Sequence, residues 1–475
     1  MTTELSNFAA RLREHIPSFS DVAAEVTRLT LQNRQSAISN RHLSEPPHVG
    51  CYENEFNTLA LELFALQFQH NAAYRKICAA RGLTPGVVEH WTRIPAVPTS
   101  AFKELELTCL APAERTAVFH SSGTTEQKPS RHYHGAESLA VYEASLLAWF
   151  RPHLLTDKLK LELQPSAAPA GVQASACGCG DGDFGLVILT PPAAQAPYSS
   201  LVHMFETVRQ KLGGASVPAL SSRRSHRGGE GGSRSEFLGK LAADGSWTLD
   251  FNAVVDALSS GGDGASPPPQ TPDARPLLLL GTAFSFVHLL DFLAEQDLRF
   301  QLPAGSRVME TGGYKNRSRS LPKTELHQLI TERLGVPPSH IICEYGMSEL
   351  SSQAYDTKLE RRAPTRRDAV GVQALACSDG TLKHELQRAG SETGAPPGWR
   401  YFRFPPWARV QIISPETGRE VTDGETGLIR VFDLANVFSV MAIQTEDLGI
   451  RRDEHFELIG RAALAEARGC SLMTT

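Results

Sequence analysis

Five small or hydroxylated residues in a row, Ser121 to Thr125, follow an apolar stretch that includes Phe119. Gly123 lets a backbone approach an anion closely, and the hydroxyl side chains add donors beside the main-chain N–H groups. No Gly-Lys-Ser/Thr sequence closes the run, so it is not a Walker loop. The pattern predicts a phosphate-binding loop with Lys128 or Arg131 as the neighbouring cation. For the loop taken alone, an ordinary polar turn is the alternative.

A second motif, Glu344 to Glu349, reads Glu-Tyr-Gly-Met-Ser-Glu and follows the apolar run 340–343. It predicts a loop that leaves a buried strand, and ligands bind at such strand exits in α/β folds. The Glu349 carboxylate is the candidate ligand for Mg²⁺, a hard cation that prefers oxygen. Taken alone, Glu349 could equally be a helix-cap acid.

The composition is that of a soluble globular protein, with 475 residues and 41% hydrophobic content. The 47 Lys and Arg against 52 Asp and Glu leave a net charge of −5, which argues against nucleic-acid and membrane partners and favours a small-molecule substrate. The amino terminus lacks a basic segment followed by an apolar one, as a signal peptide has, and the eight cysteines lack a disulfide pattern. We therefore expect a cytoplasmic protein with reduced thiols.

Periodicity and composition predict an α/β protein in four consecutive parts. Stretches rich in Gly, Ser and Pro near 213–235 and 259–275 have the composition of flexible insertions in the second part. The parts are a helical entry region over 1–100, an α/β core over 101–400, a β-rich subdomain over 401–460, and a short tail over 461–475 that carries Cys470.

Local patterns within these parts predict individual elements. Apolar residues on one helical face predict a helix over 136–150, so that strand, phosphate loop and helix follow one another. The longest apolar run, 276–293, contains polar residues and is short for a bilayer span of about 20 residues, so we expect a core strand that passes into a helix. Alternation predicts strands over 408–413 and 428–434, separated by a turn at 415–418.

The two motifs, in this order, resemble the adenylate-forming superfamily of acyl-activating enzymes. The resemblance implies a large N-terminal domain with mixed sheets, and ATP and Mg²⁺ as cofactors. It implies that Gly312 and Gly313 contact adenine with Tyr314 close by, that Asp447 binds the ribose hydroxyls, and that Arg461 contacts the nucleotide at a hinge. The cofactor-binding residues it implies are Ser121, Ser122, Gly123, Thr124, Thr125, Lys128, Gly312, Gly313, Tyr314, Tyr345, Gly346, Ser348 and Asp447.

More narrowly, the chain resembles the acyl-protein synthetase family, typified by the ligase component of the bacterial fatty acid reductase that serves bioluminescence. The matching segments are 94–98 with 102–103, 121–125, 199–201, 311–315, 344–353 and 468–472. The resemblance implies that a carboxylic acid, a fatty acid above all, is adenylated and that the acyl group passes to Cys470 and then to a partner reductase. The catalytic residues are then Glu349, which also binds the metal, together with Arg461 and Cys470.

Physical chemistry also favours Cys470 as the acyl acceptor. The thiolate is the acyl acceptor, and its reference pKa of about 8.5 falls near cationic groups. Arg468 lies two residues away, Gly469 adds flexibility, and only five residues follow Cys470, so the thiol could move between two sites on a mobile tail. Without the upstream motifs, a cysteine on a disordered end is the alternative.

The chain departs from the superfamily pattern in two places. Glu126 stands where the phosphate loop usually has Gly, and Lys128 is shifted by one position. Only fourteen residues follow Arg461, so we expect the small C-terminal domain to be truncated or absent, and the source of a catalytic lysine is open. Two alternatives to an acyl-protein synthetase therefore stay open. One is a ligase that transfers the acyl group to coenzyme A or to a carrier protein, and the other is a non-catalytic nucleotide-binding scaffold.

Overall fold

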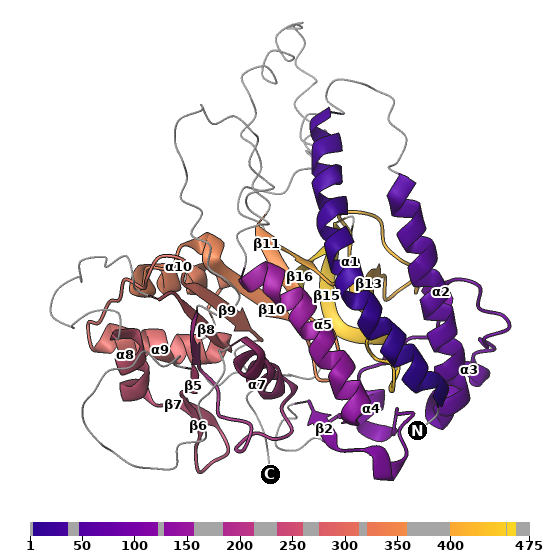
Figure 1. Ribbon diagram of the computed structural model, residues 1–475, viewed down its shortest axis with the longest axis horizontal. Coiled ribbons are helices and arrows are strands. Elements are labelled where there is room, and N and C mark those ends of the chain that lie inside the picture. The colour runs from indigo at the N-terminus through magenta and orange to yellow at the C-terminus, as the bar shows by residue number, and fades with distance from the viewer. Residues whose placement is uncertain are drawn as a thin grey trace, which may run out of the picture.

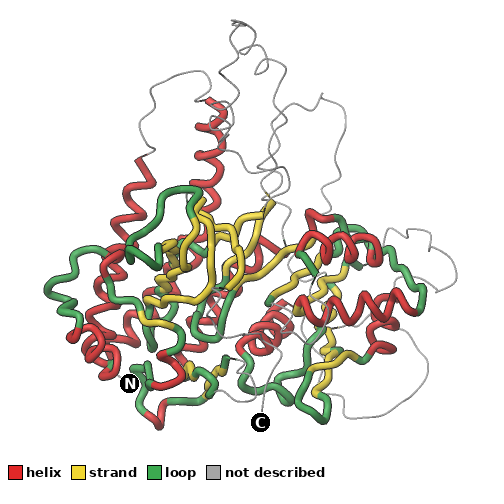
Figure 2. Tube along the Cα trace, turned by 180° about the vertical axis from the view of Figure 1, so that it is seen from behind, coloured by secondary structure: helices red, strands yellow, loops and turns green. Residues whose placement is uncertain are grey.

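A mixed sheet runs through the molecule and is covered by helices on both faces (Figures 1 and 2). The computed structural model describes residues 3–36, 47–121, 128–155, 184–212, 235–259, 275–312, 321–358, 400–452 and 454–461. Within these residues, twelve strands form the sheet, in the order β13-β14-β15-β16-β12-β11-β10-β9-β8-β4-β5 with β1 paired to β15. The α/β fold expected from the sequence is confirmed.

One half of the sheet is parallel. Its strands are β5 (Ser235–Phe237), β4 (Gly185–Ile188), β8 (Leu277–Thr282), β9 (Arg307–Thr311) and β10 (Ile341–Tyr345). Successive side chains point to opposite faces, so Leu278 and Leu280 join one core cluster while Leu279 joins the other. Because both faces are buried, these strands read as continuous apolar runs. Their carboxyl ends lie along one edge, where loops leave the sheet.

Helices fill both sides of the parallel strands. Three cover the face of Leu279: α8 (Phe251–Ser259), α9 (Ala283–Glu295) and α10 (Lys323–Leu334). Two cover the face of Leu278 and Leu280: α5 (Ala136–Leu154) and α7 (Ser200–Leu212). The predicted helix over 136–150 and the predicted passage from strand to helix over 276–293 are therefore confirmed. A small hairpin of β6 (Gly239–Leu241) and β7 (Trp247–Leu249) lies before α8.

The other half of the sheet is mainly antiparallel. It consists of β11 (Ala354–Lys358), β12 (Arg400–Arg403), β16 (His455–Arg461), β15 (Ala442–Arg452), β14 (Thr426–Asp433) and β13 (Ala408–Ile413), with β1 (Val97–Pro98) parallel to β15. β11 pairs antiparallel with both β10 and β12. The strands of the predicted β-rich region are thus joined edge to edge to the parallel half, which brings β15 and β16 near the exit of β10.

The amino-terminal region is helical, with α1 (Thr3–Ser36), α2 (Pro47–His70), α3 (Ala72–Ala80), η1 (Trp91–Arg93) and α4 (Ala101–Glu104). Gln67 on α2 is buried, and its amide donates to the Asn436 carbonyl at 2.7 Å and accepts from the Met441 N–H at 3.0 Å. The helical region therefore holds the loop that follows β14. Among the described residues, no helix combines the length and apolar content that a membrane crossing needs.

The expected order of strand, loop and helix around Ser121 was wrong in one respect. After η2 (Pro112–Glu114) and β2 (Ala117–His120), the chain returns as a second strand, β3 (Arg131–His134), before α5 begins. The backbone N–H of Ser121 donates to the Ser130 hydroxyl at 3.3 Å, and the N–H of Ser130 donates to the Ser121 hydroxyl at 3.1 Å. β3 was missed because its buried side chains are His132 and His134, which do not read as an apolar alternation.

Candidate active site

Part of the predicted site lies outside the described residues. This holds for Ser122, Gly123, Thr124, Thr125, Gly313, Tyr314 and Cys470, whose predicted roles stay predictions. The structure places the other predicted residues on β10, β15 and β16 and on the loops that leave β2, β9 and β10. Those that it describes are Ser121, Lys128, Gly312, Tyr345, Gly346, Ser348, Glu349, Asp447 and Arg461.

Tyr345, Asp447 and Arg461 form one cluster at the junction of the two halves of the sheet. The Tyr345 hydroxyl donates to Asp447 Oδ2 at 2.9 Å, across 102 residues of sequence. Arg461 lies opposite Asp447 in the β15–β16 register, with its Nε 3.2 Å from Asp447 Oδ1, and it also donates to Glu446 at 2.9 Å. Burial, and next the negative charge of Asp447, hold the Tyr345 pKa well above its ordinary value, so the phenol stays protonated as a donor.

Glu349 is fully buried, and its neighbours hold both its main chain and its side chain. The Ser348 hydroxyl donates to Glu349 Oε2 at 2.9 Å, and the Asn436 amide donates to the Glu349 carbonyl at 2.9 Å. Nδ1 of His132, on β3, lies 2.8 Å from the Ser348 carbonyl, so the ring donates from this nitrogen. His132 thereby links the hairpin that carries the predicted phosphate loop to the loop that carries Glu349.

His132 is a site residue that the sequence did not connect to Glu349. Burial lowers its pKa, and the hydrogen bond to the Ser348 carbonyl and the charge of Glu349 oppose this only in part, so a neutral ring is expected at neutral pH. No local sequence pattern could reveal this contact, because it joins residues 216 positions apart.

Asp433 is a second site residue that sequence reasoning missed. It ends β14, is fully buried, and accepts hydrogen bonds from the N–H groups of Ser351 at 2.9 Å and Ser352 at 2.8 Å and from the Ser352 hydroxyl at 2.7 Å. Burial raises its pKa to about 6 even though these donors favour the carboxylate. Asp433 thus anchors the chain shortly after Glu349. In the sequence, the position of Asp433 at the end of a predicted strand was the feature that could have indicated this role.

Two glycines are required by the local geometry. Gly312, directly after β9, has φ 73°, in the left-handed region that side chains other than glycine rarely adopt. At Gly346, a Cβ atom would clash with Glu344 Oε1. Gly312 is therefore favoured by its backbone conformation, and Gly346 by the position of the Glu344 carboxyl group.

Lys128 lies at the surface. Its Nζ is 3.2 Å from the Glu104 carboxylate, and both side chains are more than half exposed, at 51% and 69%. Exposed pairs of this kind contribute about 0–1 kcal/mol, so an incoming phosphate could compete for the lysine at little cost. Among the described residues, no group of three or more His, Cys, Asp or Glu side chains is arranged to hold a metal ion.

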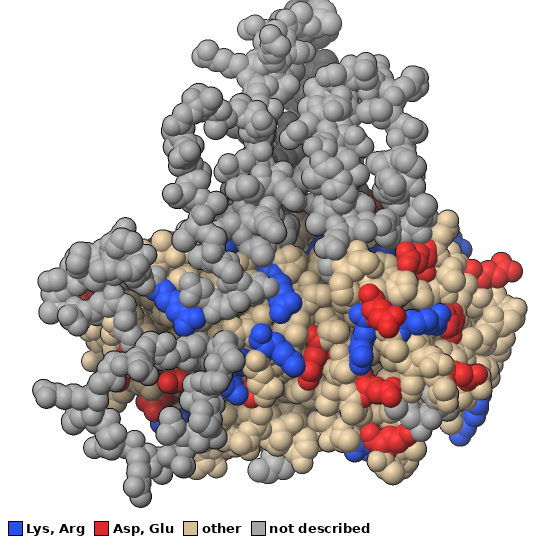
Figure 3. All heavy atoms as spheres, viewed as in Figure 1, with Lys and Arg blue, Asp and Glu red and all other residues tan. Residues whose placement is uncertain are grey.

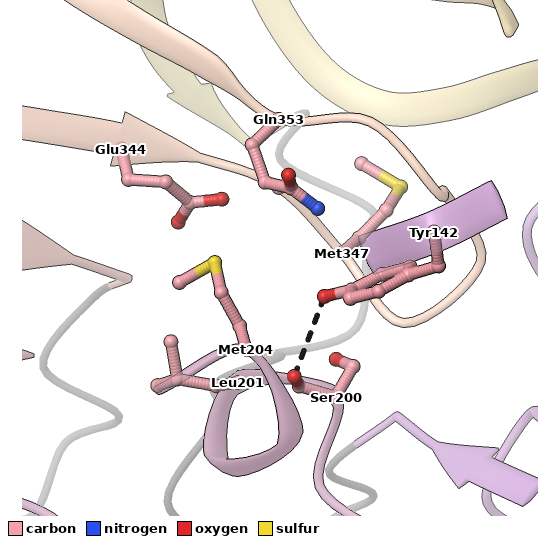
Figure 4. A pocket seen from close by; sticks show the side chains of 8 residues that line it. Tyr142, Ser200, Leu201, Met204, Glu344, Met347 and Gln353 are labelled. Carbon is pink, nitrogen blue, oxygen red and sulfur yellow. Dashed lines mark hydrogen bonds between the residues drawn. The ribbon is translucent and has the colours of Figure 1, made fainter. Parts of the chain in front are cut away.

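A pocket lies beside the Glu344–Glu349 segment (Figure 4). It measures about 290 Å³ when the solvent at its mouth is included. Glu344 and Tyr345 are neighbours on β10, so their side chains leave opposite faces of the strand, and the pocket lies across the strand from Asp447. Its lining residues are Tyr142, Ser200, Leu201, Met204, Glu344, Gly346, Met347 and Gln353.

Solved structures of similar shape show which fold this is. With 12% identity and a TM-score of 0.53, the chain resembles 2-hydroxyisobutyryl-CoA ligase in complex with 2-HIB-AMP and CoA, over 89% of this chain and 70% of that one. The same ligase in its postadenylation state matches at 13% identity and a TM-score of 0.52, over 86% of this chain and 67% of that one. The fold is that of the adenylate-forming enzymes. The mixed α/β fold that the resemblance implied is therefore confirmed.

Sequence comparison gives a weaker likeness. The chain is 22% identical over 210 residues to the long-chain-fatty-acid–luciferin-component ligase of Aliivibrio fischeri. The match spans 42% of this chain and 45% of that protein, which is less than half of either. No protein-family model matches the chain.

Proposed function

We propose that this protein is an ATP- and Mg²⁺-dependent ligase that adenylates a carboxylic acid and passes the acyl group to Cys470 for delivery to a partner protein. The observation that carries the proposal is the contact of Asp447 with both Tyr345 and Arg461 at the exit of β10, the strand whose following loop carries Glu349. The partner would be an acyl-accepting reductase or a carrier protein, and the acid a small molecule. The likeness to the Aliivibrio fischeri ligase supports a fatty acid among the possible classes.

The chemistry explains why these groups are needed. A carboxylate is a poor electrophile because its charge repels nucleophiles and its oxygen leaves poorly. In the first step a carboxylate oxygen attacks the α-phosphorus of ATP, the bond to the β-phosphate oxygen breaks, and pyrophosphate leaves. In the second step the Cys470 thiolate attacks the acyl carbon, forms a thioester and releases AMP. Both steps require the reacting atoms to be held in line.

The described residues would divide this work. Asp447 would accept hydrogen bonds from the ribose hydroxyls, while Tyr345 and Arg461 orient its carboxylate. Glu349 would hold Mg²⁺, which when bound neutralises charge on the leaving pyrophosphate. His132 and Asp433 keep the Glu349 loop in place through its main chain. Because these supports are buried, the loop is preorganised for the reaction.

Pyrophosphate exchange into ATP tests the first step directly. The chain should catalyse exchange that depends on one of a panel of straight-chain, branched, hydroxylated and aryl acids, and on Mg²⁺. If no acid supports exchange while ATP still binds, the chain is a nucleotide-binding scaffold and the proposal is wrong.

A second candidate acceptor is coenzyme A. It is supported by the solved ligase of the same fold, which is bound to CoA. Product analysis separates the two acceptors, because transfer to coenzyme A yields a small thioester that passes an ultrafiltration membrane, whereas transfer to Cys470 leaves the acyl group on the protein.

Asp447→Asn is expected to raise the KM for ATP about tenfold or more, because a charged acceptor for the ribose contributes roughly 1.5–3 kcal/mol. Asparagine can still accept the Tyr345 hydrogen bond, so the unfolding temperature should change little. Steady-state exchange at varied ATP measures the effect. Asp297→Asn, at a side chain that is 96% exposed, is the matched control. An unchanged KM for ATP would remove Asp447 from the nucleotide site.

A further inference from the structure

The pocket of Figure 4 combines polar and apolar side chains. Met204, Leu201 and Met347 supply apolar surface, whereas Glu344 and Gln353 direct a carboxyl and an amide group into the same space. Glu344 and Gln353 are buried, with exposed fractions of 6% and 5%. A pocket for a plain hydrocarbon chain has no use for buried groups of this kind, because each must be desolvated.

The polar groups of the pocket are only partly hydrogen-bonded. The Thr311 hydroxyl donates to Glu344 Oε2, while Glu344 Oε1 accepts no hydrogen bond within the described residues. Among the same residues, the side-chain amide of Gln353 makes no hydrogen bond. Leaving one such buried group unpaired costs about 1–3 kcal/mol. The pocket therefore has unused hydrogen-bonding capacity that a ligand can satisfy.

Building on the proposed function, we propose that the acid activated here carries a hydrogen-bond donor, a hydroxyl or amino group, that binds Glu344 and Gln353. A hydroxyl would donate to Glu344 Oε1 and accept from the Gln353 amide, and an amino group would pair with the Glu344 carboxylate. An unsubstituted alkyl chain would leave both side chains unpaired. The substituent, rather than the length of the chain, then selects the acid.

The electrostatics of Glu344 agree with this role. Burial, and to a lesser degree the charge of Glu310, raise the Glu344 pKa to about 7, although the Thr311 hydrogen bond opposes the shift. A donor on the ligand favours the ionised carboxylate and offsets part of this desolvation. The absence of a side chain at Gly346 leaves room for Glu344 Oε1, which a Cβ atom at this position would displace.

Matched pairs of acids test the proposal. Each pair differs only in a hydroxyl or amino group that replaces a methyl group, for example 6-hydroxyhexanoate or 6-aminohexanoate against heptanoate, and 4-hydroxybenzoate against 4-methylbenzoate. For at least one pair, kcat/KM for pyrophosphate exchange should favour the substituted acid by about 100-fold or more, since sites built to hydrogen-bond a substituent reject analogues that lack it. Glu344→Leu should reduce this ratio to within about threefold of unity.

Two further variants and a binding measurement keep the result interpretable. Glu344→Gln retains an acceptor for Thr311 and should fold even if Glu344→Leu does not, with a smaller loss of preference. Glu295→Leu makes the same chemical change at an exposed position on α9 and should leave the ratio unchanged. Wild-type preference for the methyl acids, or an unchanged ratio in both Glu344 variants, overturns the proposal. Calorimetry of acid binding without ATP separates this inference from the proposed function. Tighter binding of the substituted acid without pyrophosphate exchange supports the inference and contradicts the proposed function.

Discussion

Cys470→Ser is expected to abolish the acyl-protein while acid-dependent pyrophosphate exchange stays within about twofold of wild type. The thiolate is the nucleophile in thioester formation, and a serine hydroxyl is far less ionised at neutral pH. Radiolabelled acid, ATP and Mg²⁺ should label the wild-type chain, and neutral hydroxylamine should release the label. The variant should carry no hydroxylamine-sensitive label. A variant that still becomes labelled would show that Cys470 is not the acceptor.

Cys109→Ser is a suitable control for this experiment. Burial raises the Cys109 pKa to about 12 and the Cys78 pKa to about 11, so both thiols stay protonated at neutral pH. Burial also holds the Cys343 pKa well above its ordinary value. Labelling should therefore persist in Cys109→Ser. If label remains on Cys470→Ser, mass spectrometry of its peptides identifies which other cysteine accepts the acyl group.

Glu349→Gln is expected to lower pyrophosphate exchange by roughly 100- to 1,000-fold, because a group that stabilises charge in the transition state typically contributes about 3–4 kcal/mol. The amide oxygen of glutamine can accept the Ser348 hydrogen bond, so the loop should keep its shape. Exchange is measured at varied Mg²⁺, and the metal concentration for half-maximal rate should rise in the variant. Glu325→Gln, at an exposed position on α10, is the control.

The metal titration also separates two explanations for a loss of activity. If Glu349 acts through Mg²⁺, high metal concentration should restore part of the rate in Glu349→Gln. If Glu349 is only structural, exchange falls with an unchanged Mg²⁺ dependence and the unfolding temperature falls with it. The second result would show that Glu349 is not a metal ligand. Asp433 and Asn436 would then support a loop that does not bind metal.

The charge balance of the chain also agrees with a small-molecule substrate. On the face shown in Figure 3, basic and acidic side chains of the described residues are interspersed. The net charge of −5 adds no long-range attraction for a polyanion. Recognition is therefore expected to depend on the pocket and on the loops at the exit of β10.

Local patterns in the sequence predicted much of the fold. The apolar run 276–293 correctly predicted a strand that passes into a helix, and the alternation over 408–413 correctly predicted β13. The motif at Glu344–Glu349 correctly indicated a strand exit, although β10 extends to Tyr345. The hairpin strand β3 escaped prediction because a buried histidine does not read as apolar.

By itself, the sequence determined several of the strands and helices and which residue types could bind a nucleotide, because both are encoded within a few neighbouring positions. Only the tertiary structure decided that Tyr345 meets Asp447, that His132 holds the Ser348 carbonyl, and that Glu344 enters a pocket. These contacts join segments 102 and 216 residues apart or depend on which face of a strand is buried. Burial then determines how such groups behave, because desolvation shifts the pKa of Glu344 and Tyr345 in ways that residue type alone does not specify.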